Sequence, residues 1–117
     1  MKKIFLIMGL LISSLVFSQE VKTYVKCDIT ETVAYTKVSE EGILLEEGKY
    51  NATGKHIGTW KQYDQDGNLL VIAKFKNGVK HGTWKHWFDN KYAEVVYNEG
   101  RRVFSKMIVE KHYIASN

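Results

Sequence analysis

Proline, cysteine and long apolar runs are scarce in this sequence of 117 residues. It contains no proline, but proline disrupts helix interiors and central strands alike, so its absence does not choose between helix and sheet. The single cysteine, Cys27, excludes an internal disulfide, and we expect it to be a half-buried strand residue, with pairing between two chains as the alternative. Packing alone must therefore hold the fold together.

The only extended apolar run lies at the N-terminus, from Ile4 to Val16. It is shorter than the roughly 17–25 residues that cross a bilayer as a helix. Lys2 and Lys3 precede it and Ser18 follows it, which is the order of a secretory signal peptide cleaved before Gln19. We therefore predict a signal peptide over residues 1–18 and export to the periplasm or the extracellular space, with a membrane anchor as the alternative.

Removal of the predicted signal peptide leaves residues 19–117, which is enough chain for one small domain. Loss of Lys2 and Lys3 lowers the net charge from +4 to +2, so the predicted mature domain is nearly neutral. The only dense basic cluster is Arg101-Arg102, which we interpret as a charged turn. Nucleic-acid binding is not indicated by this charge.

Motifs that carry catalysis or bind cofactors are also missing. The two spaced glycine pairs, Gly54/Gly58 and Gly78/Gly82, lack the Lys-Ser/Thr ending of a phosphate loop. Neither Ser39 nor Ser105 has the surroundings of a nucleophile elbow. A run of carboxylates is expected to form a solvated edge: Glu40, Glu41, Glu46 and Glu47. We predict no enzyme activity and no cofactor.

Four histidines raise the question of a zinc site. His81 and His86 are five residues apart, which places them on opposite faces of a strand and is unsuited to shared ligation. His56 and His81 precede equivalent motifs and are explained by the repeat described next. We predict no metal site.

An internal repeat is the strongest pattern that is present. Gly58-Thr59-Trp60-Lys61-Gln62-Tyr63 returns 24 residues later as Gly82-Thr83-Trp84-Lys85-His86-Trp87. Weaker copies begin upstream at Glu41-Gly42 and end downstream at Glu99-Gly100. A period of this length indicates an array in which each unit buries its apolar face by stacking on the next unit.

Each unit has the pattern of a β-hairpin. Strand-forming residues alternate after Gly67, so that Leu69, Val71, Ala73 and Phe75 share one face of the predicted strand. Asp66-Gly67 and Asn77-Gly78 are typical of tight turns. The sequence therefore predicts an all-β fold, an antiparallel meander of repeated hairpins in a single sheet.

The ends of the domain depart from the repeat. We expect residues 19–38 to form one or two capping strands, residues 39–102 to form the repeats and residues 103–117 to form the C-terminal cap. A short helix within residues 103–114 is the alternative to a strand there.

The segment from Gly67 to Phe88 resembles the variant MORN repeat, as found in bacterial proteins called YwqK-family antitoxins. The shared pattern is a turn glycine, an apolar strand ending in Phe75, then Asn77-Gly78, His81-Gly82 and Trp84 with a second aromatic three residues on. The resemblance covers roughly residues 40–102. It implies a repeat scaffold, and the antitoxin label implies a protein partner.

The repeated aromatic pairs are the candidate binding residues. An interval of three places Trp60 and Tyr63 on opposite faces of a strand, and likewise Trp84 and Trp87. We expect Trp60 and Trp84 in the core and Tyr63 and Trp87 on the surface, where they bind a partner. The alternative is that all four rings only pack the sheet.

Two functions are compatible with these patterns. The first is a protein-interaction module, in the role of an antitoxin or immunity protein, with Tyr63 and Trp87 as partner-binding residues. The second is a membrane-surface or lipid-associated scaffold, which the near-neutral charge disfavours. A small hydrolase is disfavoured because no catalytic constellation can be named.

Overall fold

The computed structural model describes residues 19–89 and 91–109 and folds them into one antiparallel sheet. The strands are β1 (Val21–Cys27), β2 (Thr32–Val38), β3 (Leu44–Tyr50), β4 (His56–Tyr63), β5 (Leu69–Lys76), β6 (Val79–Lys80), β7 (Gly82–Phe88), β8 (Lys91–Asn98) and β9 (Arg101–Val109). The order across the sheet is the order along the chain, except that the two-residue β6 pairs with β5 beside the main path.

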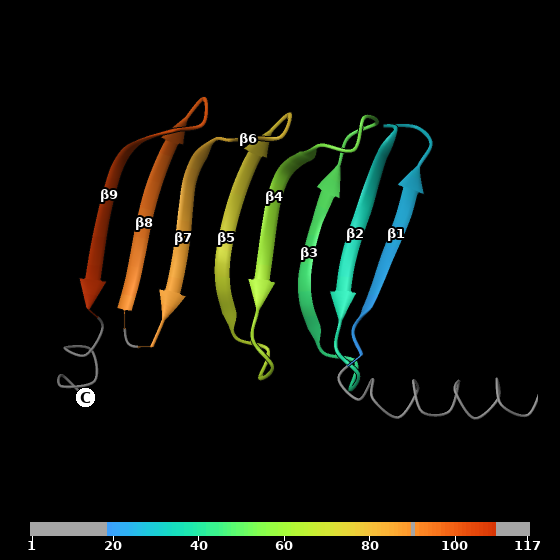
Figure 1. Ribbon diagram of the computed structural model, residues 1–117, viewed down its shortest axis with the longest axis horizontal. Helices are drawn as coiled ribbons and strands as arrows, with labels where there is room; N and C mark the ends of the chain where they lie inside the picture. The colour runs from blue at the N-terminus through green and yellow to red at the C-terminus, as the bar shows by residue number, and fades with distance from the viewer. Residues whose placement is uncertain (1–18, 90, 110–117) are drawn as a thin grey trace, which may run out of the picture.

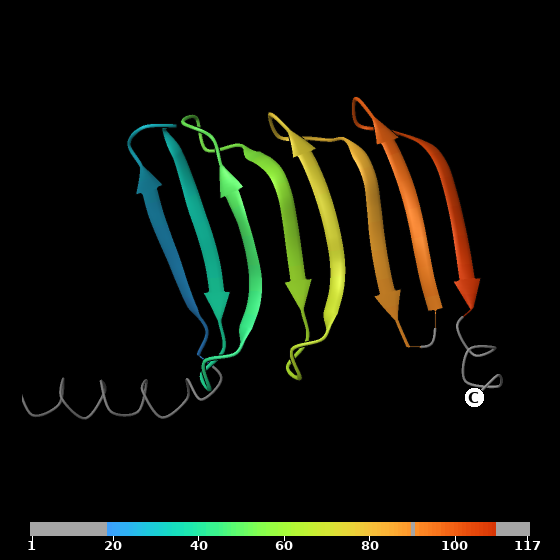
Figure 2. The same cartoon turned by 180° about the vertical axis from the view of Figure 1, so that it is seen from behind.

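The sheet is a single layer. Figures 1 and 2 view it from opposite sides, and no second layer of described residues covers either face. The predicted all-β meander of hairpins is confirmed. Residues 103–109 continue β9 as a strand and not as a helix. Within the described part of the chain no helix is long and apolar enough to span a membrane. The predicted signal peptide lies outside the described residues.

The register defines two faces, because directly paired residues point to the same side of a sheet. Trp60 pairs with Ala73 and Tyr35 pairs with Gly48 on one side, which we call the aromatic face. Lys61 pairs with Ile72 on the other side, which we call the lysine face.

The core lies on the aromatic face and alternates large and small residues across the strands. Trp60 is only 4% exposed, and Tyr35 and Ala73 are buried with it. A side chain at Gly48 would occupy the place of the Trp60 indole, so glycine is required there. The Trp60 Nε1–H donates a hydrogen bond of 3.1 Å to the carbonyl of Lys49. A one-layer sheet thus buries a ring by laying it over the backbone of the next strand.

Three of the connections between strands are five-residue loops with the same hydrogen-bond pattern. In each loop the first residue accepts a hydrogen bond on its backbone carbonyl from the glycine three positions later, as in the bond of 3.0 Å from Gly67 to Asp64. The side-chain oxygen of that first residue also accepts a backbone bond, as from Asn68 to Asp64 at 2.8 Å. The three loops are 39–43, 51–55 and 64–68. The turn predicted at Asp66-Gly67 lies within the loop 64–68, and Gly67 has a positive φ of 84°, but the loop has five residues and is organised by Asp64.

Two other turns are tight. Asn77 and Gly78 have φ values of 51° and 83°, which is the left-handed pair that a two-residue hairpin turn of type I′ requires. Glu99 and Gly100 repeat this geometry with φ values of 52° and 83°. The tight turn predicted at Asn77-Gly78 is confirmed.

Candidate functional site

The two full repeats each place one lysine and one aromatic ring on the lysine face. Tyr63 follows Lys61 by two residues on β4, and Trp87 follows Lys85 by two residues on β7. Because alternate residues of a strand share a face, each lysine and its ring point the same way. β5 separates β4 from β7, so the two pairs lie about 10 Å apart.

Tyr63 is half-buried, whereas we predicted an exposed ring. Its hydroxyl donates a hydrogen bond of 2.7 Å to the carboxylate of Glu47 on β3. That bond, followed by burial, raises the pKa of Tyr63 above its ordinary value. The ring is thus fixed in place on the lysine face and keeps part of its surface open.

Trp87 is also half-buried, because its neighbour on β8 covers part of the ring. Its centroid lies 5.2 Å from that of Tyr92, its paired residue. The Tyr92 hydroxyl in turn donates to Glu94, and burial together with this bond raises the pKa of Tyr92 to about 12. Ile108 on β9 pairs with Tyr92 and extends the apolar row to the edge strand.

The rings predicted for the core lie on the opposite face, as the interval of three requires. Trp60 is buried, and Trp84 is half-buried against Phe75 at 5.2 Å and Tyr97 at 5.2 Å. The sequence therefore predicted the face of each ring correctly but overestimated how fully Trp84 is buried and how far Tyr63 and Trp87 are exposed.

Charge separates strongly between strands and loops. Among the described residues the strands hold thirteen Lys or Arg and three Glu, a net of +10. The segments outside the strands hold one Lys and nine Asp or Glu, a net of −8. The near-neutral total charge conceals two basic faces bounded by acidic loops.

On the lysine face three basic side chains surround one apolar residue. Lys61 and Lys85 are the paired neighbours of Ile72 on its two sides, and Lys74 is the next residue of the same face on β5. Among the described residues the ion pairs within 4 Å are Lys37–Glu20 and Lys106–Glu94, so none of these three lysines is engaged in one. This group, Lys61, Lys74 and Lys85, is called the lysine triad below.

The aromatic face has a shallow hollow of about 260 Å³ beside the two indoles. Val71, Ala73 and Phe75 of β5 line it, and His86 closes one side. Burial, and then the positive charge of Lys80, lowers the pKa of His86. The Lys80 ammonium lies 4.9 Å from the Trp84 centroid and 5.0 Å from that of Tyr97. These two rings therefore already make cation–π contacts with a lysine of the same chain.

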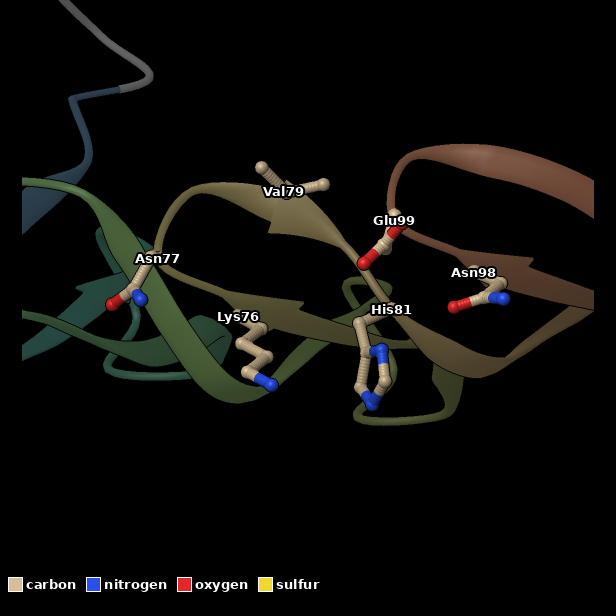
Figure 3. Close-up of a pocket in the computed structure, with 6 residues that line it drawn as sticks. All are labelled: Lys76, Asn77, Val79, His81, Asn98 and Glu99. Atoms are coloured by element: carbon tan, nitrogen blue, oxygen red, sulfur yellow. The ribbon is translucent and has the colours of Figure 1, made fainter.

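A second hollow, of about 430 Å³, lies between the two tight turns. Figure 3 shows Lys76 and His81 pointing to one side of the ribbon and Val79 to the other. Asn98 and Glu99 of the next turn complete the lining. The side chains do not converge on one point, so the arrangement has no evident chemistry.

Titratable side chains do not gather into a metal site in the described part of the chain, where no three His, Cys, Asp or Glu residues are grouped as ligands. His56 packs against Trp60 with a centroid distance of 4.2 Å, in the position that Lys80 takes on Trp84 one repeat later. His81 is exposed at the turn.

Two carboxylates that we interpreted as part of a solvated edge have structural partners. Glu46 accepts hydrogen bonds from the Tyr35 hydroxyl and the Gln62 amide, both at 3.1 Å. Glu47 holds Tyr63 on the opposite face. The sequence signal for these hydrogen bonds was that both glutamates lie within a predicted strand whose neighbouring strands carry Tyr and Gln.

Comparison with protein-family models, with curated proteins and with solved structures gives no match.

Proposed function

We propose that this protein is an exported, non-enzymatic binding module of the MORN-repeat type, which holds a protein partner against its lysine face. An immunity or antitoxin role, in which the sheet covers a toxin surface, is one form of this activity. Export rests on the predicted signal peptide over residues 1–18, and the intact mass of the mature chain tests cleavage after Ser18.

The observation that carries the proposal is the repeated lysine–aromatic pair. Trp60 and Trp84 pack in or against the core, but Tyr63 and Trp87 lie on the other face and do not cover the core. Half-exposed Trp and Tyr rings on neighbouring hairpins are the residues that dominate interface energies, where one anchor contributes about 2 kcal/mol or more. The repeated hairpin geometry is also what a MORN-type scaffold would supply.

The test is capture of the partner by variants of the immobilised protein. Trp87→Ala should leave the circular dichroism spectrum unchanged and reduce partner capture at least about tenfold, as loss of an anchor residue does. Tyr63→Phe, which removes only the hydroxyl bonded to Glu47, is the milder second variant. The matched control is Phe88→Ala, which removes an exposed ring next to Trp87 on the aromatic face. Undiminished capture by folded Trp87→Ala would leave these rings with a purely structural role.

A membrane-surface role is the second candidate. The thirteen basic residues of the strands favour it, because anionic lipid attracts each basic residue by about 1 kcal/mol. Flotation with anionic vesicles tests it directly, and we expect the protein to stay unbound for the reason given next.

A further inference from the structure

We infer that the partner docks through an acidic segment that lies across the lysine triad and ends within the height of the sheet. This inference rests on the proposed function and specifies the chemistry of the partner. Its basis is the charge of the lysine face, the spacing of the triad and the acidic loops at the lower edge of the sheet.

The lysine triad is a site of excess positive charge in the middle of the lysine face. Its three lysines neighbour Ile72 on β4, β5 and β7, and their ammonium groups have no carboxylate within 4 Å among the described residues. Glu47 and Glu94 stand at the two outer ends of the same cross-strand row, beside Lys61 and Lys85. Each carboxylate accepts a hydrogen bond from a tyrosine hydroxyl and keeps its negative charge, and Glu94 also pairs with Lys106. Two carboxylates therefore face four lysines, the triad and Lys106. An acidic group from outside the chain would therefore complete the charge balance at the centre of the row.

The spacing indicates more than one carboxylate with an apolar residue between them. Lys61 and Lys85 flank Ile72 on neighbouring strands, so their stems leave the sheet about 10 Å apart with an apolar side chain at the midpoint. Trp87 and Tyr63 continue the surface toward the lower loops. An extended segment along β5 matches this arrangement if it places an apolar side chain over Ile72 and acidic side chains two residues before and after it, because residues two apart share a face.

The acidic loops limit the length of the partner segment along the strands. The lower edge of the sheet in Figure 1 holds loops 39–43 and 64–68 and the turn at Asp89. These connections carry Glu40, Glu41, Asp64, Asp66 and Asp89. A membrane plane or a nucleic acid would extend past this edge and meet the five carboxylates. A peptide segment of about eight residues spans only about 26 Å and fits within the strands.

The experiment measures binding of a fluorescein-labelled octapeptide, Glu-Ser-Leu-Ser-Glu-Ser-Leu-Ser, in which glutamate and leucine alternate along one face, to the purified full-length chain by fluorescence polarisation. The matched probe has glutamine in place of every glutamate. We expect the glutamate peptide to bind at least about tenfold more tightly than the glutamine peptide, and we expect this preference to shrink as salt is raised.

Variants locate the site. Lys61→Glu/Lys85→Glu should weaken binding of the glutamate peptide at least about tenfold, and the neutral pair Lys61→Gln/Lys85→Gln should weaken it by less. The charge-matched control, Lys22→Glu/Lys26→Glu on edge strand β1, should change binding less than about twofold. Circular dichroism confirms that each variant is folded. Equal losses for triad and control, or equal affinity for the two peptides, overturns the inference.

The same assay includes vesicles containing phosphatidylglycerol and a single-stranded thymidine oligonucleotide. Binding of either one that exceeds peptide binding and depends on Lys61 and Lys85 also overturns the inference, in favour of a membrane or nucleic-acid surface. If capture of the natural partner needs Trp87 but is unaffected at Lys61 and Lys85, the proposed function stands and the acidic segment does not.

Discussion

The two full repeats use the same device with different completeness. Trp60 and Trp84 both lie two residues after a glycine with positive φ. Each donates its Nε1–H to a backbone carbonyl of an adjacent strand, Trp60 to that of Lys49 and Trp84 to that of Lys74. Trp60 is buried and Trp84 is only half-buried. The difference shows that sequence identity within the motif does not fix burial.

The neighbours of each indole account for the difference. Trp60 is surrounded by rings on its own side of the sheet, with centroid distances of 5.4 Å to Tyr35, 5.0 Å to Tyr50 and 4.2 Å to His56. Among the described residues Trp84 has two rings at such distances, Phe75 and Tyr97, both at 5.2 Å. Beyond Trp84 the same row of side chains ends in Ser105 on β9, which carries no ring. Packing therefore weakens from the N-terminal to the C-terminal side of the repeats.

The largest expected effect is loss of the better packed ring. Trp60→Ala should destabilise the fold by about 3–5 kcal/mol, because a large buried ring is replaced by a cavity. Trp84→Ala should cost less, since its ring is already partly open to solvent, and Lys85→Ala should stay within about 0.5 kcal/mol. Denaturant midpoints of the three variants give the order. Equal midpoints for Trp60→Ala and Trp84→Ala would remove the distinction between the repeats.

The residue beneath each ring gives the next test. Ala73 in the second repeat occupies the position of Gly48 in the first repeat. Gly48→Ala should destabilise by about 1–3 kcal/mol, because the added Cβ would occupy the Trp60 indole. The reverse change, Ala73→Gly, should cost only about 0.5–1 kcal/mol through chain entropy. Thermal unfolding compares them, and a Gly48→Ala protein as stable as wild type would show that Trp60 can move aside.

The sequence predicted what depends on period and left out what depends on neighbouring strands. The repeat placed Trp60 and Trp84 on one face and Tyr63 and Trp87 on the other because strand alternation is local. The need for glycine at position 48 was not predicted, since its reason is the indole of Trp60, twelve residues away on the next strand. The turn at Asn77-Gly78 was predictable from its own φ preference, whereas the loop at Asp64 depends on a side-chain acceptor that the dipeptide Asp66-Gly67 does not reveal.

The candidate site was predictable in its rings and not in its charge. Tyr63 and Trp87 follow from the interval of three, but their half-burial depends on Glu47 and Tyr92 of adjacent strands. The lysine triad was hidden because a net charge of +2 averages strands and loops whose charges have opposite sign. Strand boundaries are needed to separate them, and boundaries are the least reliable part of a reading from sequence.

The smallest expected effect distinguishes the repeats by pH. His86 in the second repeat stands where the first has Gln62. Burial and Lys80 lower the pKa of His86, so the unfolded chain binds a proton more readily than the folded protein. Stability from neutral His86 is present above the ordinary histidine pKa of about 6.5 and is lost as pH falls below it. His86→Gln should therefore reduce the loss of stability between pH 7.5 and pH 5.5.

The reciprocal variant should change stability in the opposite direction. Gln62 donates its amide to Glu46, so a histidine at position 62 would face that carboxylate and gain a proton more readily in the folded protein. Gln62→His should then gain stability as pH falls through the same range, whereas wild type loses it. Urea midpoints of wild type, His86→Gln and Gln62→His at the two pH values test both signs. An unchanged pH dependence in His86→Gln would mean that the imidazole is solvated in both states, and that the second repeat is as open at this position as the first.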